Sequence, residues 1–285
     1  MDAIVIDNRL RTMADEVSRA IVSCPDARIA VAFLSQSGLD IIRPAIEENI
    51  NRGGQIEFLI GLDGRITEPE AVQTLYNLSC QFSNVSVYCH PFLTEGAIYH
   101  PKLYLFQTNE NVCLVVGSSN LTRNGLEKNL EVNVRIFAST HDQVAIEAYD
   151  SYQELKFHPN RIIPDQEFLT LYAQMFQEAN KQRAGEKARR ERETSNLTRL
   201  YRQKISTMRR PVWNRYRDLV GWLKVVYDML PDDEFRNEDV YAHEDFFRQK
   251  YPGNRNIRAK IRQQLQFLRD EGLIEHLDRG YWRKL

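Results

Sequence analysis

A histidine and a lysine, both with reactive side chains, open an apolar segment near the middle of the chain. His100 and Lys102 stand two positions apart, and Ser118 and Asn120 follow the next apolar segment. Side chains at positions i and i+2 of a β-strand share a face, so each pair would point to one side. The imidazole can act as a nucleophile, and the other three groups can stabilise negative charge. These residue types suit a reaction at an anionic centre; the simpler alternative is a surface hairpin with a polar turn.

The motifs around these residues indicate a family. HPK at 100–102 and GSSN at 117–120 resemble the H-x-K and G-S-x-N signature of the phospholipase D superfamily. In the single-motif nucleases of that superfamily an acidic residue follows the Asn, at a distance that Glu131 matches here. The resemblance implies a phospholipase D-like α/β fold, with a mixed sheet flanked by helices, and phosphodiesterase activity. It also implies a catalytic set made of His100, Lys102, Ser118, Asn120 and Glu131.

Phosphodiester chemistry gives each of these groups a role. His100 would attack phosphorus to form a phosphohistidine, and a second histidine would protonate the leaving oxygen and later activate water. Lys102, Ser118 and Asn120 would stabilise the charge that develops on the phosphoryl oxygens. Glu131 would hold the second imidazole nitrogen and so fix the tautomer. Lysines take the place of metal cations in this scheme, so we expect no divalent metal and no other cofactor.

The chain departs from the family pattern in two ways. Gln107 stands nearest to the place of the usual Asp after the Lys, which argues against a lipid substrate more than against catalysis. The chain also has a single H-x-K, whereas lipid-acting members usually carry two. None of the other histidines has a Lys two positions later: His90, His141, His158, His243 and His276. The second histidine must then come from another subunit, which predicts a homodimer through the N-terminal domain.

Strand and helix patterns alternate through the first half of the chain. Buried-strand patterns at 27–34, 55–62 and 84–90 are separated by helical patterns at 37–54 and 68–82. This alternation by itself predicts an α/β domain with a largely parallel sheet. A hairpin at 102–116 and a strand at 130–137 would complete the sheet, and helices at about 140–155 and 165–180 would close the domain.

Composition indicates a globular protein with two chemically different parts. Hydrophobic residues make up 42% of the 285 positions, and no apolar run is long enough to span a bilayer. The N-terminus lacks signal-peptide features, so we expect a cytoplasmic protein without a membrane partner. Four scattered cysteines are interpreted as buried, reduced thiols. Residues 178–285 hold 25 Lys and Arg against 17 Asp and Glu, a net charge of +8, whereas residues 1–177 carry −9.

These patterns divide the chain into a nuclease-like domain at 1–177, a charged linker at 178–207 and a basic domain at 208–285. Helical patterns in the last part cover 212–230, 237–252 and 256–272, and 273–285 reads as a hairpin that turns at Asp278-Arg279-Gly280. Three helices and a hairpin describe a winged helix-turn-helix. The segment also resembles the Dam-replacing winged-helix family, most closely at IRAKIRQQLQFLRDEGLIE and RGYWRK.

The third of these helices is the candidate DNA-reading helix. Its predicted core stripe consists of Ile257, Ile261, Leu265 and Leu268. Polar residues cluster toward its N-terminal half, the part that enters the major groove in helix-turn-helix proteins. The candidate DNA-binding residues are Asn254, Arg255, Arg258, Arg262 and Gln263 on this segment, and Arg279, Tyr281 and Arg283 on the wing. A solvated face without a DNA partner is the alternative.

Together these features predict a metal-independent, restriction-type endodeoxyribonuclease that acts on double-stranded DNA. The N-terminal domain would cut and the C-terminal domain would read sequence; whether the DNA must be methylated stays open. Two alternatives remain. One is a non-enzymatic DNA-binding regulator on a nuclease scaffold, and the other is a phospholipid phosphodiesterase, which the single motif and the DNA-reading domain disfavour.

Overall fold

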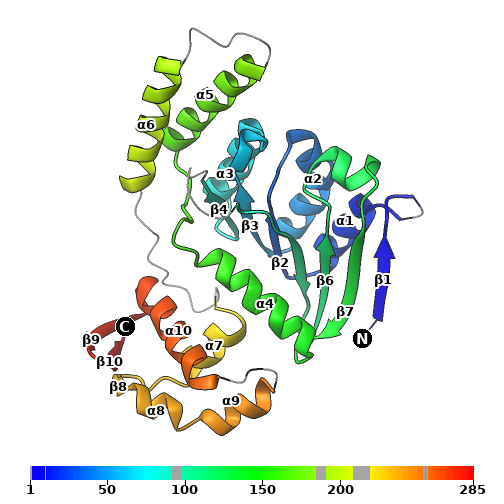
Figure 1. The fold of residues 1–285 in the computed structure, drawn as a ribbon. Coiled ribbons are helices and arrows are strands. Elements are labelled where there is room, and N and C mark those ends of the chain that lie inside the picture. Colours follow the sequence, from blue (N-terminus) through cyan, green and yellow to red (C-terminus); the bar gives the residue numbers. More distant parts are fainter. Residues whose placement is uncertain are drawn as a thin grey trace. The chain divides into compact units, whose positions relative to one another are not determined.

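The chain divides into two compact units. In the computed structural model, residues 2–9, 11–91, 98–183, 191–207, 219–252, 254 and 256–285 are described. One unit comprises Met1–Ser139 with His158–Arg209, and the other comprises Thr140–Phe157 with Arg210–Leu285. Figure 1 shows the elements of both units in sequence colours.

The N-terminal unit is built on a seven-stranded mixed sheet. Its strand order is β1-β7-β6-β5-β2-β3-β4, and only the pairs β2/β3 and β3/β4 are parallel among the pairings described. The prediction of a largely parallel sheet was therefore wrong, whereas the mixed sheet that the family resemblance implied is confirmed. The reason is that helices cross over between β2, β3 and β4, whereas β5 and β6 are joined by the tight loop 108–110, and β6 and β7 by the segment 118–132, which returns to pair antiparallel. The strands are β1 Asp2–Ile6, β2 Asp26–Val31, β3 Gln55–Gly61, β4 Val85–His90, β5 Lys102–Gln107, β6 Asn111–Gly117 and β7 Asn133–Ser139.

The main hydrophobic core lies between this sheet and helices α1 (Met13–Ser23), α2 (Gln36–Asn51) and α3 (Pro69–Gln81). Ile29, Phe58 and Tyr104 from three adjacent strands are fully or almost fully buried in it. Helices α2 and α3 were predicted, whereas β1 and α1 were not.

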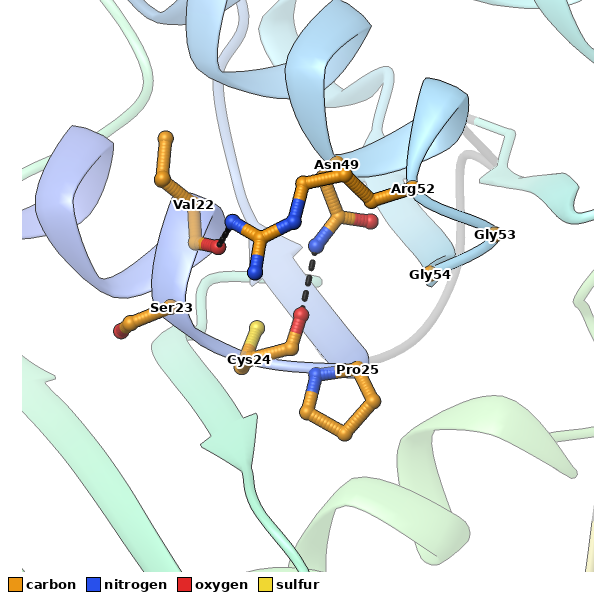
Figure 2. A pocket seen from close by; sticks show the side chains of 8 residues that line it. All are labelled: Val22, Ser23, Cys24, Pro25, Asn49, Arg52, Gly53 and Gly54. Carbon is orange, nitrogen blue, oxygen red and sulfur yellow. Dashed lines mark hydrogen bonds between the residues drawn. The ribbon is translucent and has the colours of Figure 1, made fainter.

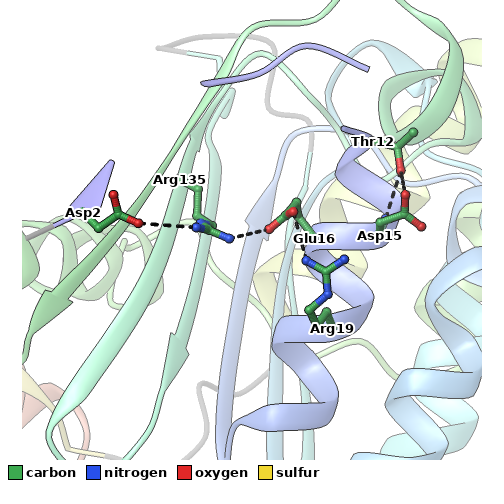
Figure 3. Close-up of polar contacts among 6 residues, drawn as sticks. All are labelled: Asp2, Thr12, Asp15, Glu16, Arg19 and Arg135. Atoms are coloured by element: carbon green, nitrogen blue, oxygen red, sulfur yellow. Dashed lines mark hydrogen bonds and ion pairs between the residues drawn. The ribbon is translucent and has the colours of Figure 1, made fainter. Parts of the chain in front are cut away.

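An ion-pair network attaches α1 to the edge of the sheet (Figure 3). The buried Glu16 of α1 accepts a hydrogen bond of 2.8 Å from Arg135 of β7 and forms a 3.1 Å ion pair with Arg19. Arg135 also lies 3.7 Å from Asp2 of β1. Figure 3 shows Arg135 between the two carboxylates, so one guanidinium joins α1 and β1 to β7.

Two further helices, α5 (Gln166–Arg183) and α6 (Glu191–Thr207), pack together in this unit. Tyr201 of α6 is buried, with its ring 5.2 Å from that of Phe168. Lys204 forms ion pairs of 2.8 Å with Asp165 and 2.7 Å with Glu167. Residues 191–207 thus form a packed helix of the N-terminal unit, whereas the sequence indicated a linker there.

The C-terminal unit contains the three predicted helical regions and the hairpin, with different boundaries. It comprises α7 (Gly221–Asp228), α8 (Asn237–Tyr241), α9 (Glu244–Lys250), α10 (Ile257–Asp270) and a three-stranded sheet in the order β8-β10-β9. The sheet strands are β8 Glu234–Arg236, β9 Ile274–Asp278 and β10 Tyr281–Lys284.

Local geometry explains the differences in helix boundaries. Val220 is extended and α7 begins after it; residues 212–218 lie outside the described part. The helix predicted at 237–252 is interrupted between α8 and α9. Asn237 is the first residue of α8, and its side chain accepts a hydrogen bond of 2.9 Å from Trp282. The third helix is confirmed, with Asn256 as its N-cap and Gly272 at φ +72° just beyond its end.

Helix α4 (Gln143–Lys156) belongs to the C-terminal unit. Ile146 of α4 is buried in the same cluster as Trp222 and Leu223 of α7. At the start of α7, Gly221 has a φ of +55°, and a β-carbon there would lie 3.4 Å from Asp150 Oδ1. The sequence had placed this helix in the N-terminal domain, because its position in the chain follows the last strand of the sheet.

The pocket drawn in Figure 2 is a hollow of about 160 Å³ at the amino end of β2. Asn49 Nδ2 donates hydrogen bonds to the carbonyls of Ile21 (2.7 Å) and Cys24 (2.6 Å), and Arg52 donates one of 3.0 Å to Val22. These bonds tie the end of α2 to the end of α1. None of the candidate catalytic residues lines this hollow.

The four cysteines are free. Cys24 and Cys89 are buried and Cys113 is half-buried, but Cys80 on α3 is exposed, so the prediction that all four are buried was wrong. Within the described residues no helix is both long and apolar enough to cross a membrane.

Candidate active site and DNA-binding surface

The predicted catalytic residues meet at one edge of the N-terminal sheet. In the strand register Val31 lies opposite Lys102, Leu103 opposite Val116, and Gly117 opposite Asn133. The carboxyl ends of β2 and β6 therefore meet the amino ends of β5 and β7. This arrangement brings His100 and Lys102 to the same edge as residues 118–120 and 131.

His100 and Lys102 are in direct contact. Lys102 Nζ lies 2.9 Å from Nδ1 and 3.1 Å from Nε2 of the imidazole, and donates a 3.2 Å hydrogen bond to the His100 carbonyl. Lys102 is buried, with 8% of its surface exposed. The ring of Phe33 lies edge-on to His100 at 5.5 Å and 5.7 Å from Lys102 Nζ. An apolar wall therefore backs both reactive groups.

This environment lowers the pKa values of both side chains. Burial lowers the pKa of Lys102, and the charge of Glu131 partly opposes that shift. Although His100 is partly open to solvent, partial burial lowers its pKa too. The Lys102 ammonium lowers it further, and Asp63 acts in the opposite direction. A neutral imidazole is the form that can attack phosphorus.

Ser118, Asn120 and Glu131 lie in loops beyond the strands. Strand β6 ends at Gly117, so strand alternation does not orient Ser118 and Asn120 as the sequence suggested. Ser118 Oγ donates a short hydrogen bond to the Glu131 carboxylate and accepts one of 3.0 Å from the amide of Val132. Asn120 Oδ1 accepts a 3.1 Å hydrogen bond from the amide of Phe33, which fixes the orientation of the side-chain amide.

Glu131 was expected to hold the His100 imidazole. The structure places its carboxylate against Ser118 and against Asn129 Nδ2 at 3.0 Å, and its charge acts on Lys102. Phe33, Asp63 and Asn129 belong to the surroundings of the site and were missed by the sequence reasoning. Phe33 and Asp63 lie two positions beyond the ends of β2 and β3, so polar and aromatic residues just after the buried strands were a usable signal.

Helix α10 of the C-terminal unit has the predicted core stripe: Ile257, Ile261, Leu265 and Leu268 are all buried. Arg258 and Arg262 lie on its exposed side. Arg258 donates a 2.7 Å hydrogen bond to Glu244 and lies 5.3 Å from the ring of Tyr241, and Arg262 bonds the Tyr241 hydroxyl at 3.2 Å. Tyr241 therefore holds two arginines one helical turn apart on one surface.

The other candidate DNA-binding residues have different environments. Asn254 Oδ1 accepts a 2.8 Å hydrogen bond from the amide of Asn256, Gln263 is half-buried, and Arg255 lies outside the described residues. On the wing, Arg283 is held by Glu234 at 2.6 Å and by Glu275 at 3.3 Å. Tyr281 donates a short hydrogen bond to Glu234, whereas Arg279 is exposed at the turn. Arg279 is thus the wing cation that is most open to a polyanion.

Two family models match the sequence, and between them they cover both units. Residues 23–154 match the family described as "Cardiolipin synthase, PLD-like domain", and residues 218–284 match the "Dam-replacing HTH domain". The chain carries a phospholipase D-like domain and a Dam-replacing helix-turn-helix domain. The resemblances stated from the motifs are confirmed.

Several solved structures are similar to part of this chain. NucT from Helicobacter pylori is 17% identical, covers 54% of this chain and 95% of its own length, and has a TM-score of 0.43. The phospholipase D family member Nuc from Salmonella typhimurium is 18% identical, with coverages of 54% and 93% and a TM-score of 0.43. Phosphatidylserine synthase from Haemophilus influenzae is 10% identical, covers 64% of this chain and 45% of its own length, and has a TM-score of 0.44. Similarity at this level says nothing about activity.

Within the phospholipase D-like domain, Gln107 cannot replace the missing Asp at the catalytic edge. It pairs with Asp26 at the far end of β5, five residues from Lys102, or about 16 Å along an extended strand. The described part of the chain also contains no group of three or more His, Cys, Asp or Glu side chains arranged to hold a metal ion.

Proposed function

We propose that this protein is a sequence-specific, metal-independent DNA endonuclease of the restriction type. The observation that carries the proposal is the contact between His100 and Lys102 at the sheet edge that also presents Ser118 and Glu131. The same chain carries a Dam-replacing helix-turn-helix domain. A phosphodiesterase motif joined to a helix-turn-helix domain favours DNA over lipid as the substrate.

The side chains account for the two halves of a hydrolysis. Neutral His100 attacks phosphorus, a phosphorus–nitrogen bond forms, and the bond to the leaving oxygen breaks as a second histidine donates a proton to that oxygen. Water, deprotonated by the second histidine, then cleaves the phosphohistidine and restores both residues. Lys102 and the amino group of Asn120 stabilise the negative charge on the phosphoryl oxygens.

The second histidine comes from a second copy of the chain in this proposal. Each chain has a single H-x-K. His90, near the motif, is buried and stacks on Tyr99. Large apolar side chains beside the catalytic residues are exposed: Ile98 at 70%, Leu130 at 89% and Val132 at 64%. Their burial between two N-terminal units would favour a twofold dimer with both His100 residues at one composite site.

Digestion in EDTA tests the proposed activity. The purified protein should cut double-stranded DNA into fragments with defined ends in EDTA, because the scheme uses no metal-bound water. Parallel digests of methylated and unmethylated DNA of the same sequence decide whether methylation is needed, and sedimentation should show a dimer at assay concentration. Strict dependence on added Mg²⁺ would contradict the proposed mechanism. Tight DNA binding without cleavage under any of these conditions would instead support the regulator.

Replacement of Arg262 by alanine should weaken specific DNA binding without changing the chemistry. If Arg262 makes a bidentate base contact, its loss should cost about 1–3 kcal/mol and relax the preference at one base position. Binding to cognate and scrambled duplexes at fixed salt measures this effect. Arg269→Ala is the matched control, because Arg269 lies at the far end of α10 and pairs with Asp270 at 2.7 Å. Equal losses for both variants would show that Arg262 does not read sequence.

A further inference from the structure

An acidic residue that no motif includes lies beside the H-x-K. Strand β3 ends at Gly61, the amide of Leu62 donates to the His90 carbonyl at 3.0 Å, and Asp63 follows in a tight turn. Gly64 and Arg65 both have positive φ values, +64° and +51°. Such a conformation is rare for a residue with a side chain, and it concentrates at functional sites. The turn brings Asp63 to the catalytic edge.

Asp63 fixes the backbone that leads into His100. Its Oδ2 accepts a 2.7 Å hydrogen bond from the amide of Tyr99. The Tyr99 ring stacks on His90, with centroids 3.9 Å apart and planes 14° apart. A β-carbon at Gly61 would lie 2.8 Å from Tyr99 Cδ1, so only glycine leaves room for this ring. Asp63, His90 and Gly61 thus hold the residue that immediately precedes the proposed nucleophile.

Charge also links Asp63 to His100. Burial raises the pKa of Asp63, while the Tyr99 amide and His100 act in the opposite direction. Two charged groups act on the imidazole in the described part of the chain: Lys102 of β5 favours its neutral form, and Asp63 beyond β3 favours its protonated form. Glu131 acts instead on Lys102. The family pattern gave Glu131 the role of stabilising the imidazole. In this structure that role is divided, because Asp63 acts on His100 and Glu131 acts on Lys102.

We propose that Asp63 is the positioning carboxylate of His100: it holds the backbone at Tyr99 and supplies the negative charge that stabilises the protonated imidazole. The inference rests on the proposed function only for its effect on cleavage. In a dimer, Asp63 would stabilise the protonated imidazole of the His100 that donates a proton to the leaving oxygen. Lys102 would favour the neutral imidazole of the other His100, which attacks phosphorus. Opposed charges acting on one imidazole would allow the same residue to serve in both roles.

Asp63→Asn tests the charge while keeping an oxygen for the Tyr99 amide. The pKa of His100 in this variant, followed by NMR titration and assigned against His100→Ala, should fall below that of the wild type. Turnover should fall about tenfold in kcat with little change in KM, because the proton-donating form becomes scarcer. Asp40→Asn, on the surface of α2 and paired with Arg43, is the matched control and should change neither quantity.

The outcomes separate this inference from the proposed function. Wild-type cleavage with an unchanged titration and rate in Asp63→Asn would overturn the role of Asp63 and leave the nuclease proposal standing. A shifted titration in a protein that never cuts DNA would support Asp63 and overturn the nuclease. If the variant does not fold, the wild-type Tyr99 amide provides the test. The chemical shift of the Tyr99 amide should change as Asp63 is protonated in a pH titration. A Tyr99 amide shift that stays constant while Asp63 titrates would overturn the hydrogen bond between the two residues.

Discussion

Replacement of His100 by alanine is expected to abolish DNA cleavage, with a loss of about 10⁴-fold or more in kcat. The loss is large because each subunit contributes the same residue, so the substitution removes the nucleophile and the proton donor together. Folding and DNA binding should be preserved, because the His100 side chain is exposed and its removal leaves no cavity in the core. Single-turnover cleavage and gel-shift binding measure the two properties separately.

Mixed dimers sharpen this test. A wild-type subunit paired with a His100→Ala subunit holds only one imidazole at the composite site, so the mixed dimer should also be inactive. His141→Ala, which changes an exposed histidine, is the control and should cut normally. Wild-type cleavage by the homodimeric His100→Ala variant would show that the segment at 98–120 is a structural hairpin.

Replacement of Lys102 by methionine is expected to reduce cleavage by about 10²–10³-fold, the usual cost of removing one group that stabilises the charge of the transition state. The variant should also raise the pKa of His100, because the ammonium that lowers it has gone. Since attack needs neutral imidazole, the acidic side of the residual pH–rate profile should move to higher pH. Lys181→Met, on the exposed surface of α5, should leave rate and profile unchanged. An unchanged His100 titration in Lys102→Met would contradict the contact between the two side chains.

Short-range patterns predicted much of the fold. Buried strands and helical spacing located β2, α2, β3, α3 and β4, because the strands are continuous buried apolar runs and the two helices each bury one face. Strand direction was less predictable, since it depends on which connections contain a crossover helix. Strand β1 was missed because it pairs with β7, which is distant in sequence, whereas the cap at Thr12 and the buried Met13, Val17 and Ile21 were a local signal for α1 that was not used.

In the catalytic site, too, residues in a local sequence pattern could be predicted and long-range contacts could not. His100, Lys102 and Ser118 could be named because their spacing follows a motif, and the register of β5 and β6 brings them to one edge. The partner of Glu131 could not be predicted, because it is determined by how the loops beyond β6 and β7 fold. Asp63 escaped notice because its contact with Tyr99 spans 36 residues and has no local pattern.

Helix α4 limits how such a protein can be assembled by recombination. The Dam-replacing domain is contiguous in sequence at 218–284, which suggests that this segment could be exchanged as one piece. Yet the compact unit that contains it also includes α4, encoded between β7 and α5, and Ile146 is buried against α7 residues. A chimera that exchanged only the C-terminal segment would place the helix-turn-helix domain of another protein against the α4 of this chain. Ile146 of α4 would then lose the α7 residues that bury it. The two units of this protein are therefore expected to evolve together, and a successful graft would have to carry its own copy of α4.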